Sequence, residues 1–337
     1  SAFPNPMVGA VLISAQQEVI ASGWHAAPGL AHAEREALLK IDTAPENSTL
    51  YVTLEPCCTF GRTPPCTSII LEKKIRRVVV GMLDPDVRMS GKGVDVLRAA
   101  GVEVCVGVLE SECRLLNRRY LDIRKQKRPT VALKSAFSLD GRTASSFGES
   151  KWITGERTRL QSHGLRSIYD GILIGSGTLL ADDPSLNCRM EGGRDPIPIV
   201  LDTNLRCPTS AKVLHAGRKP ILCCGQQAPK RTEMESFRMD CSLSNGRIDL
   251  ATLLPRLYQK GIYTLLVEGG ATVAKAFLEQ GFVDILELYV GSQIIGSGKN
   301  WCDLIPRHLS DAIRFRLRGV NQLDSDVHLS YLREIGV

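Results

Sequence analysis

Apolar runs and polar breaks alternate regularly along the first part of the chain. Short apolar runs predict buried strands, and the segments between them, with apolar residues on one side, predict helices. Strands are expected at 7–13, 48–54, 77–82 and 102–106, and helices at 31–41, 66–74 and 94–100. Strands that are separated by helices of about ten residues are typical of a layered α/β fold.

The second part of the chain resumes this alternation after an interruption. Residues 118–128 are basic, have little periodicity and end at Pro129. We interpret them as a solvated helix end and a linker, and we therefore predict domains at 1–125 and 126–337. Further strands are expected at 130–134, 171–175, 197–201, 220–224, 264–268 and 285–290. The second domain is thus also predicted to be of the α/β type.

Composition excludes several classes of protein. The chain has 337 residues, of which 43% are hydrophobic and 23% charged, so it is not disordered, collagen-like or a coiled coil. Its net charge of +6 is spread along the chain and weakly indicates an anionic ligand, and a small phosphorylated substrate suits it as well as a nucleic acid does. No apolar stretch approaches the length of a membrane span, and we see no signal peptide. The eleven scattered cysteines favour a reducing, cytoplasmic location.

The strongest chemical signal is a possible metal site. His32 opens a predicted helix, and Cys57 and Cys66 flank a loop rich in glycine and proline, with Cys66 starting the next helix. One imidazole and two thiolates suit zinc and leave a fourth position open for water, as a catalytic site requires. Glu34 follows His32 by two residues, so it can take a proton from that water and pass it to a leaving amine. This pattern is the zinc-deaminase signature.

Two features qualify this interpretation. A closed structural zinc site would need a fourth protein ligand, for which Cys58 is the nearby candidate. The other alternative is that the three residues are unrelated members of the core. The generic deaminase signature has two residues between the cysteines, whereas eight lie between them here. A loop inserted beside the metal should line the substrate pocket, and its Arg62 could meet a phosphate.

The second domain contains glycines at the ends of predicted strands. Gly175 and Gly177 follow one strand, and the segment 268–272 joins another strand to a helix. Glycines in such places let backbone N–H groups approach a pyrophosphate, although neither segment is a Rossmann fingerprint. Lys134 is expected at a strand end and Thr154 as a helix cap.

The sequence resembles the bifunctional deaminase–reductase family of riboflavin biosynthesis over nearly its whole length. The matching pieces are 4–11, His32-Ala33-Glu34, Glu55-Pro56-Cys57, 61–66 and the glycine-containing motifs of the second domain. The resemblance implies a cytidine-deaminase-like three-layer α/β/α domain followed by an α/β domain similar to dihydrofolate reductase. It also implies zinc-dependent deamination of a diamino-hydroxy-pyrimidine that carries a phosphoribosylamino group, and then reduction of its ribosyl chain to ribityl by NADPH.

The same resemblance assigns individual residues. Glu34 would be catalytic, and His32, Cys57 and Cys66 would bind zinc. The residues implied to contact NADPH are Ala136, Trp152, Thr178, Asp182, Thr203, Gly270, Ala271 and Thr272. Those implied to contact substrate are Asn5, His25, Ser150, Arg166, Leu186, Arg189 and Glu268. Arg166 and Arg189 suit the 5′-phosphate by charge and geometry.

The chain departs from the family at two points. Cys58 and Thr59 stand where the family usually has Ser or Asn and then a His that contacts substrate. The family also has a helix before the Pro4-Asn5-Pro6 segment, whereas the sequence here begins at Ser1.

Three alternatives remain open at this stage: a chain with one working half, a base deaminase that acts on nucleic acid, and a non-catalytic zinc-stabilised module. We expect a small phosphorylated pyrimidine as the partner, no nucleic acid or membrane, and a homo-oligomer of unknown copy number.

Overall fold

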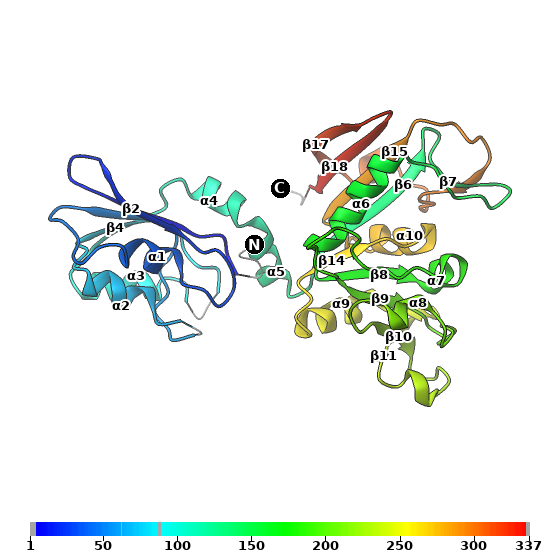
Figure 1. Cartoon of the computed structure of the whole chain (residues 1–337), viewed down its shortest axis with the longest axis horizontal. Coiled ribbons are helices and arrows are strands. Elements are labelled where there is room, and N and C mark those ends of the chain that lie inside the picture. Colours follow the sequence, from blue (N-terminus) through cyan, green and yellow to red (C-terminus); the bar gives the residue numbers. More distant parts are fainter. Residues whose placement is uncertain (1–4, 62, 87–88, 335–337) are drawn as a thin grey trace. The chain divides into compact units, whose positions relative to one another are not determined.

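The protein consists of two compact units, residues 1–127 and 128–337 (Figure 1). Their structure is a computed structural model, which describes residues 5–61, 63–86 and 89–334. Arg62, expected above to meet a phosphate, lies outside the described residues. Among the described residues, no helix has the length and hydropathy needed to cross a membrane.

The first unit contains a five-stranded sheet with the order β2-β1-β3-β4-β5. Its strands are β1 (Gly9–Ile13), β2 (Val19–Trp24), β3 (Thr49–Leu54), β4 (Arg77–Met82) and β5 (Glu103–Val106). β1 pairs antiparallel with β2 and β3, whereas β3, β4 and β5 run parallel. Parallel neighbours require crossover connections, which helices supply here.

Helices cover both faces of this sheet (Figure 1). They are α1 (Ala33–Leu38), α2 (Cys66–Glu72), α3 (Lys92–Ala99), α4 (Glu110–Leu116) and α5 (Arg118–Gln126). Leu38, Ile70 and Leu97 of α1 to α3 join one apolar cluster with Val78 and Val80 of β4. Gly81 points to the opposite face, where an added Cβ would come within 2.3 Å of the Cys113 sulfur in α4. The unit is therefore the three-layer α/β/α domain that the resemblance implied.

The basic segment 118–126, interpreted above as a helix end and a linker, forms one continuous helix, α5. Tyr120 and Ile123 are only 5% and 2% exposed, so this helix has a buried side. Three apolar positions, Tyr120, Leu121 and Ile123, among so many charged residues give too weak a periodic signal for a helix to be recognised from the sequence.

The second unit contains a nine-stranded sheet with the order β11-β10-β9-β8-β14-β6-β15-β18-β17. The strands from β11 to β15 in this order run parallel, and β18 and β17 complete the sheet antiparallel. These strands are β6 (Thr130–Ser138), β8 (Gly171–Gly175), β9 (Ile197–Leu201), β10 (Ile221–Gly225), β11 (Arg238–Cys241), β14 (Thr264–Val267), β15 (Ile285–Gly291), β17 (Phe315–Leu323) and β18 (Asp326–Arg333). Two small ribbons pair β7 (Arg142–Ser145) with β16 (Gly298–Asn300), and β12 (Leu243–Ser244) with β13 (Arg247–Ile248).

Five α-helices and two short 3₁₀ turns are described in this unit. They are α6 (Glu156–Ile168), α7 (Ser176–Asp182), α8 (Lys212–His215), α9 (Leu250–Gln259), α10 (Ala271–Glu279), η1 (Thr232–Met234) and η2 (Leu309–Asp311). α6 begins after Gly155, so Thr154 is not the cap that was predicted.

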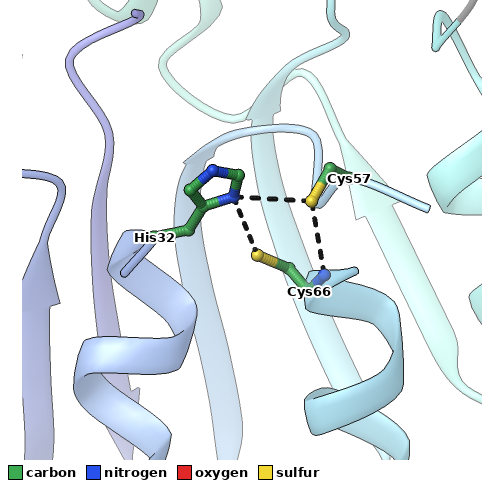
Figure 2. A group of neighbouring side chains, drawn as sticks. All are labelled: His32, Cys57 and Cys66. Carbon is green, nitrogen blue, oxygen red and sulfur yellow. Dashed lines mark hydrogen bonds between the residues drawn. The ribbon is translucent and has the colours of Figure 1, made fainter. Parts of the chain in front are cut away.

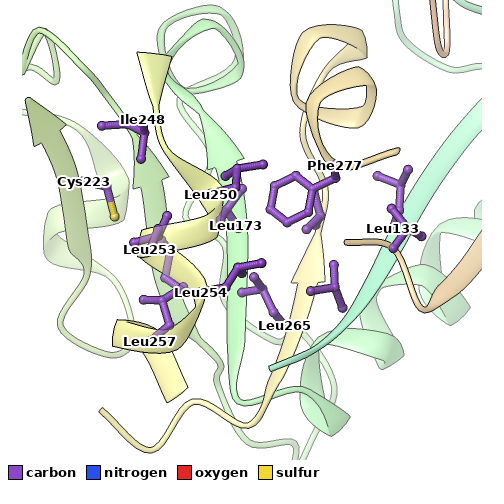
Figure 3. Packing of buried hydrophobic residues seen from close by; sticks show 14 of the residues in the cluster. Leu133, Leu173, Cys223, Ile248, Leu250, Leu253, Leu254, Leu257, Leu265 and Phe277 are labelled. Atoms are coloured by element: carbon purple, nitrogen blue, oxygen red, sulfur yellow. The ribbon is translucent and has the colours of Figure 1, made fainter. Parts of the chain in front are cut away.

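Side-chain alternation along the strands produces a core on each face of the large sheet. Val131 and Leu133 of β6 pack into one cluster with α9 and with Phe277 of α10 (Figure 3). Ala132 points to the other cluster, which contains Leu179 of α7. The strand expected at 130–134 continues to Ser138, so Lys134 lies within the strand instead of at its end. The hairpin of β17 and β18 was not predicted, because β17 is an edge strand that is mostly exposed and polar.

Candidate active sites

The three predicted metal ligands meet at the ends of two helices in the first unit (Figure 2). His32 is the N-cap of α1, Cys66 is the first residue of α2, and Cys57 lies in the loop after β3. The His32 Nδ1 atom is 3.4 Å from the Cys57 sulfur and 3.3 Å from the Cys66 sulfur. The three ligand atoms lie within 4.8 Å of one another, and Cys58 does not belong to this group. Two sulfurs and one imidazole at these separations fit a zinc ion.

The electrostatics of the group favour a metal-binding thiolate. A hydrogen bond from the Cys66 thiol, opposed by burial, lowers the pKa of Cys57 to about 4. The same interaction raises the pKa of Cys66, so the two sulfurs share one proton. The backbone N–H of Cys66 also donates to the Cys57 sulfur at 3.3 Å. A cation is therefore needed to stabilise both sulfurs as thiolates.

Glu34 lies in the first turn of α1, directly beside this group. Its side chain is buried at 3% exposure, and burial raises the pKa of its carboxyl to about 7. The negative Cys57 thiolate also raises this pKa, while His32 and a hydrogen bond from the Cys66 thiol lower it. A carboxyl that holds and releases a proton near neutral pH suits general acid–base chemistry.

Thr63 is a neighbour of the metal group that sequence reasoning missed. Its Oγ1 atom is 3.3 Å from Nε2 of His32, the ring nitrogen that faces away from the two sulfurs. Hydrogen bonds of this kind hold a ligand histidine in one tautomer and orientation. The motif spacing gave no signal for it, because the contact depends on the path of the eight-residue loop.

Glu55 is a second missed neighbour, and it organises the backbone next to Cys57. Its carboxylate is 4% exposed and accepts four backbone hydrogen bonds. The donors are the N–H groups of Asp84, Gly91, Gly93 and Val94, at 3.1, 2.9, 2.8 and 3.3 Å. Gly93 approaches the same loop so closely that a Cβ there would lie 2.0 Å from the Pro56 carbonyl oxygen.

Asn5 and His25, both predicted to contact substrate, lie together beside the metal group. The His25 Nδ1–H donates to the Ala31 carbonyl at 3.0 Å, so its Nε2 accepts from the Asn5 amide at 2.9 Å. The His25 ring also meets the His32 ring edge-on, with 5.3 Å between centroids. Both nitrogens of His25 are thus engaged within the protein, and the ring fixes the orientation of Asn5. Thr59 is exposed, and its hydroxyl contacts the Met89 sulfur at 3.4 Å.

The second unit contains a cavity of about 220 Å³ between α6, the sheet and the loop that precedes α6. Among its lining residues are the predicted Ala136, Ser150, Trp152 and Arg166, and also Lys134. Arg166 donates two hydrogen bonds to the Glu268 carboxylate, at 3.1 and 3.0 Å, and a third to the Asn187 carbonyl at 3.1 Å.

The Arg166–Glu268 pair is buried, since the two side chains are only 10% and 11% exposed. Burial raises the pKa of Glu268, but the charges of Arg166 and Lys134 outweigh it and bring this pKa to about 2. Burial in turn lowers the pKa of Lys134. The positive charge of the Arg166 guanidinium is therefore already balanced by the negative charge of Glu268.

The glycine motifs lie where the C-terminal ends of adjacent parallel strands meet helix N-termini. α7 begins after Gly175 at the end of β8, and α10 begins after Gly270, beyond the end of β14. A Cβ on Gly269 would lie 2.5 Å from Val273, so this turn packs tightly against its own helix. Exposed backbone N–H groups at such helix N-termini fit the phosphates of a dinucleotide.

The remaining predicted residues are distributed around this edge of the sheet. Thr178 and Asp182 lie on α7, and Ala271 and Thr272 begin α10. Thr203 lines a separate cavity of about 580 Å³ beyond β9. Leu186 is a buried core residue at 2% exposure, so its side chain is committed to packing, whereas Arg189 is exposed.

Comparisons with known proteins identify the family of each unit. Residues 129–329 match the RibD C-terminal domain family, and residues 1–82 match the cytidine and deoxycytidylate deaminase zinc-binding region. The chain is 39% identical to the riboflavin biosynthesis protein RibD of Aquifex aeolicus, over 98% of this chain and 93% of that protein. The chain belongs to the RibD family. It is therefore a bifunctional deaminase and reductase of riboflavin biosynthesis with zinc and NADPH as cofactors, which confirms the predicted function, cofactors and fold class.

Solved RibD structures have the same fold over nearly the whole chain. RibD of Acinetobacter baumannii aligns with a TM-score of 0.85 and 35% identity, covering 99% of this chain and 94% of that one. A diaminohydroxyphosphoribosylaminopyrimidine deaminase/5-amino-6-(5-phosphoribosylamino)uracil reductase of Thermotoga maritima aligns with a TM-score of 0.81 and 34% identity, covering 98% and 93% of the two chains.

Proposed function

We propose that the first unit deaminates a diamino-hydroxy-pyrimidine that carries a phosphoribosylamino group, and that the second unit then reduces the ribosyl chain to ribityl. The observation that carries this proposal is the convergence of His32, Cys57 and Cys66 beside the buried carboxyl of Glu34. The name of the Thermotoga relative supports the choice of substrate. We also propose that the boundary between the deaminase and reductase domains lies near residues 125 and 126.

In the deaminase, His32, Cys57 and Cys66 hold zinc. Zinc, when bound, supplies a Lewis acid that makes water acidic enough to react near neutral pH. Glu34 accepts a proton from the attacking water and delivers it to the departing amine, so that a ring C–N bond breaks, a C–O bond forms and ammonia leaves. Asn5, held by His25, orients the pyrimidine ring.

In the reductase, NADPH, when bound, would supply a hydride for C1′ of the ring-opened sugar, and a proton from water would complete the reduction. Ala136 and Trp152 border the cofactor, as do Thr178, Asp182, Thr203 and residues 270–272. Ser150, Arg166, Arg189 and Glu268 surround the substrate, and Leu186, whose side chain is buried in the core, can meet it only through its backbone. Arg189 makes no ion pair with any described residue, so it is the better partner for the 5′-phosphate, whereas Arg166 and Glu268 shape the pocket as a neutral pair.

The substrate is proposed to be a free small molecule and not a nucleic acid. A homo-oligomer is supported by Leu317 and Val320, which are 50% and 55% exposed on the edge strand β17. A cytoplasmic location is supported by the eleven cysteines, all of which are free thiols.

Glu34→Gln tests the deaminase proposal, because it keeps the shape of the side chain and removes its ability to carry a proton. We expect ammonia release to fall by about 10²–10⁴-fold while the zinc content stays that of the parent. NADPH oxidation with the deaminated substrate should be unchanged, since that chemistry belongs to the other unit. Glu36→Gln is the matched control, because Glu36 lies on the same helix and is exposed. Full ammonia release by Glu34→Gln would refute the proposal.

A further inference from the structure

Two residues that line the 220 Å³ cavity each have a buried side-chain atom with no hydrogen-bond partner among the described residues. These atoms are the hydroxyl of Tyr289 on β15 and the Nδ1 atom of His163 on α6. Buried polar groups in native proteins are nearly always hydrogen-bonded, so two orphaned atoms beside one cavity indicate a missing polar occupant. The volume exceeds the roughly 30 Å³ of one water several-fold, so the cavity can accept more than a single bridging water.

Tyr289 is held in place by its neighbours on β18 and β15. Its ring stacks on His328 of β18, with 4.5 Å between centroids and an interplanar angle of 9°. His328 is fixed in turn by Glu287, whose carboxylate lies 2.7 Å from its Nε2 atom. All three side chains are buried, and Tyr289 is fully buried. A phenol supported in this way has its hydroxyl pre-positioned, which is the arrangement expected of a binding group.

His163 lies on α6, which packs over β6 and β15 (Figure 1), three residues before Arg166. The charged groups around it are Arg166 on the same helix, Arg189, Lys134 of β6 and Glu268. Burial and the three cations lower the pKa of His163 to about 4, against the opposing effect of Glu268. The imidazole is therefore neutral at physiological pH.

Burial also raises the pKa of Tyr289, so its phenol is neutral as well. Two neutral groups that donate and accept hydrogen bonds suit the uncharged hydroxyls of a sugar. A phosphate would instead pair with the exposed Arg189.

We propose that Tyr289 and His163 are further substrate-binding residues of the reductase, and that they hold hydroxyl groups of the sugar chain at the inner end of this cavity. This inference rests on the proposed function, because it takes the phosphoribosylamino-pyrimidine as the substrate. Glu287 and His328 act through Tyr289 and are positioning residues.

Tyr289→Phe is the decisive variant, because it removes one hydroxyl and keeps the ring that stacks on His328. With purified full-length enzyme, NADPH and deaminated substrate, we expect kcat/KM of reduction to fall by about 10–100-fold. The same factor should be lost with the substrate that lacks its phosphate, since the contact is to the sugar. The melting temperature should not fall, because an orphaned buried hydroxyl does not stabilise the fold, and ammonia release should be unchanged.

Tyr258→Phe on α9 is the matched control, because it removes a hydroxyl from the same unit outside the cavity. A second pair of variants tests the inference in case the Tyr289→Phe protein does not fold. His163→Leu removes the hydrogen-bonding atom and should show the same loss of reductase kcat/KM. His163→Asn places an amide near the Nδ1 position and should restore most of it.

Several outcomes would overturn the inference. If Tyr289→Phe and His163→Leu both reduce the substrate with the kcat/KM of the parent enzyme, the inference is wrong, whereas the proposed function is unaffected. A lower melting temperature with loss of activity in both His163 variants alike would assign these residues a structural role. A parent enzyme that does not reduce the deaminated substrate would remove the proposed function and this inference with it.

Discussion

Glu55 offers the sharpest test of how the first unit is held together next to its metal site. In Glu55→Gln, an NH₂ group replaces one carboxylate oxygen, so two of the four backbone N–H donors face another donor. Each buried donor left without an acceptor costs about 1–3 kcal/mol, which gives a loss of roughly 2–6 kcal/mol. Since 1 kcal/mol corresponds to roughly 2–8 °C for domains near this size, we expect the melting temperature of the first unit to fall by at least about 4 °C.

Differential scanning calorimetry of the zinc-loaded full-length protein measures this change. Glu110→Gln is the matched control, because Glu110 forms an exposed ion pair with Arg114 that contributes less than about 0.5 kcal/mol. The loop that contains Pro56 and Cys57 should loosen in Glu55→Gln, so zinc should also be lost more readily to a chelator. Equal melting temperatures for the two variants would refute the reasoning.

Two further predictions concern other contacts of the two sites. Thr63→Val should weaken zinc binding by about 10–100-fold, because His32 loses the partner that orients its ring, and parent-like zinc affinity in a chelator competition would contradict this. The pKa of Glu268 is about 2 in the folded protein and 4.5 without its neighbours, so its contribution to stability is complete above pH 4.5 and is lost as the pH falls toward 2. In urea unfolding, the free energy of unfolding should therefore fall by roughly 3 kcal/mol more for the parent than for Glu268→Gln when the pH is lowered from 5 to 2. Equal decreases would show that Arg166 and Lys134 do not lower the pKa of Glu268.

The metal group was predictable from sequence because each ligand sits at a place that local sequence defines. His32 and Cys66 are helix starts, and Cys57 follows a strand, so the topology of parallel strands and crossover helices brings them together. Thr63 and Glu55 were missed because their contacts depend on the detailed path of a loop and on N–H groups nearly 40 residues away.

In the second unit, the sequence predicted the glycine-bearing strand ends but not the pairing of charges. Arg166 and Glu268 are 102 residues apart, and no periodic pattern links them. The stacked pair of Tyr289 and His328 could not be predicted either, because a tyrosine in an apolar strand gives the same sequence signal as any other core residue. Lys134 was placed at a strand end because its charge and the following Ser135 interrupt the apolar run of the strand.

X-ray absorption at the zinc edge of the purified protein tests the central claim most directly, because it counts the ligands of the metal. We predict two sulfurs at about 2.3 Å, one imidazole nitrogen at about 2.0 Å and one oxygen, with the same set in Glu34→Gln. A third sulfur in place of that oxygen would mean that the site is closed by protein, and it would contradict the account.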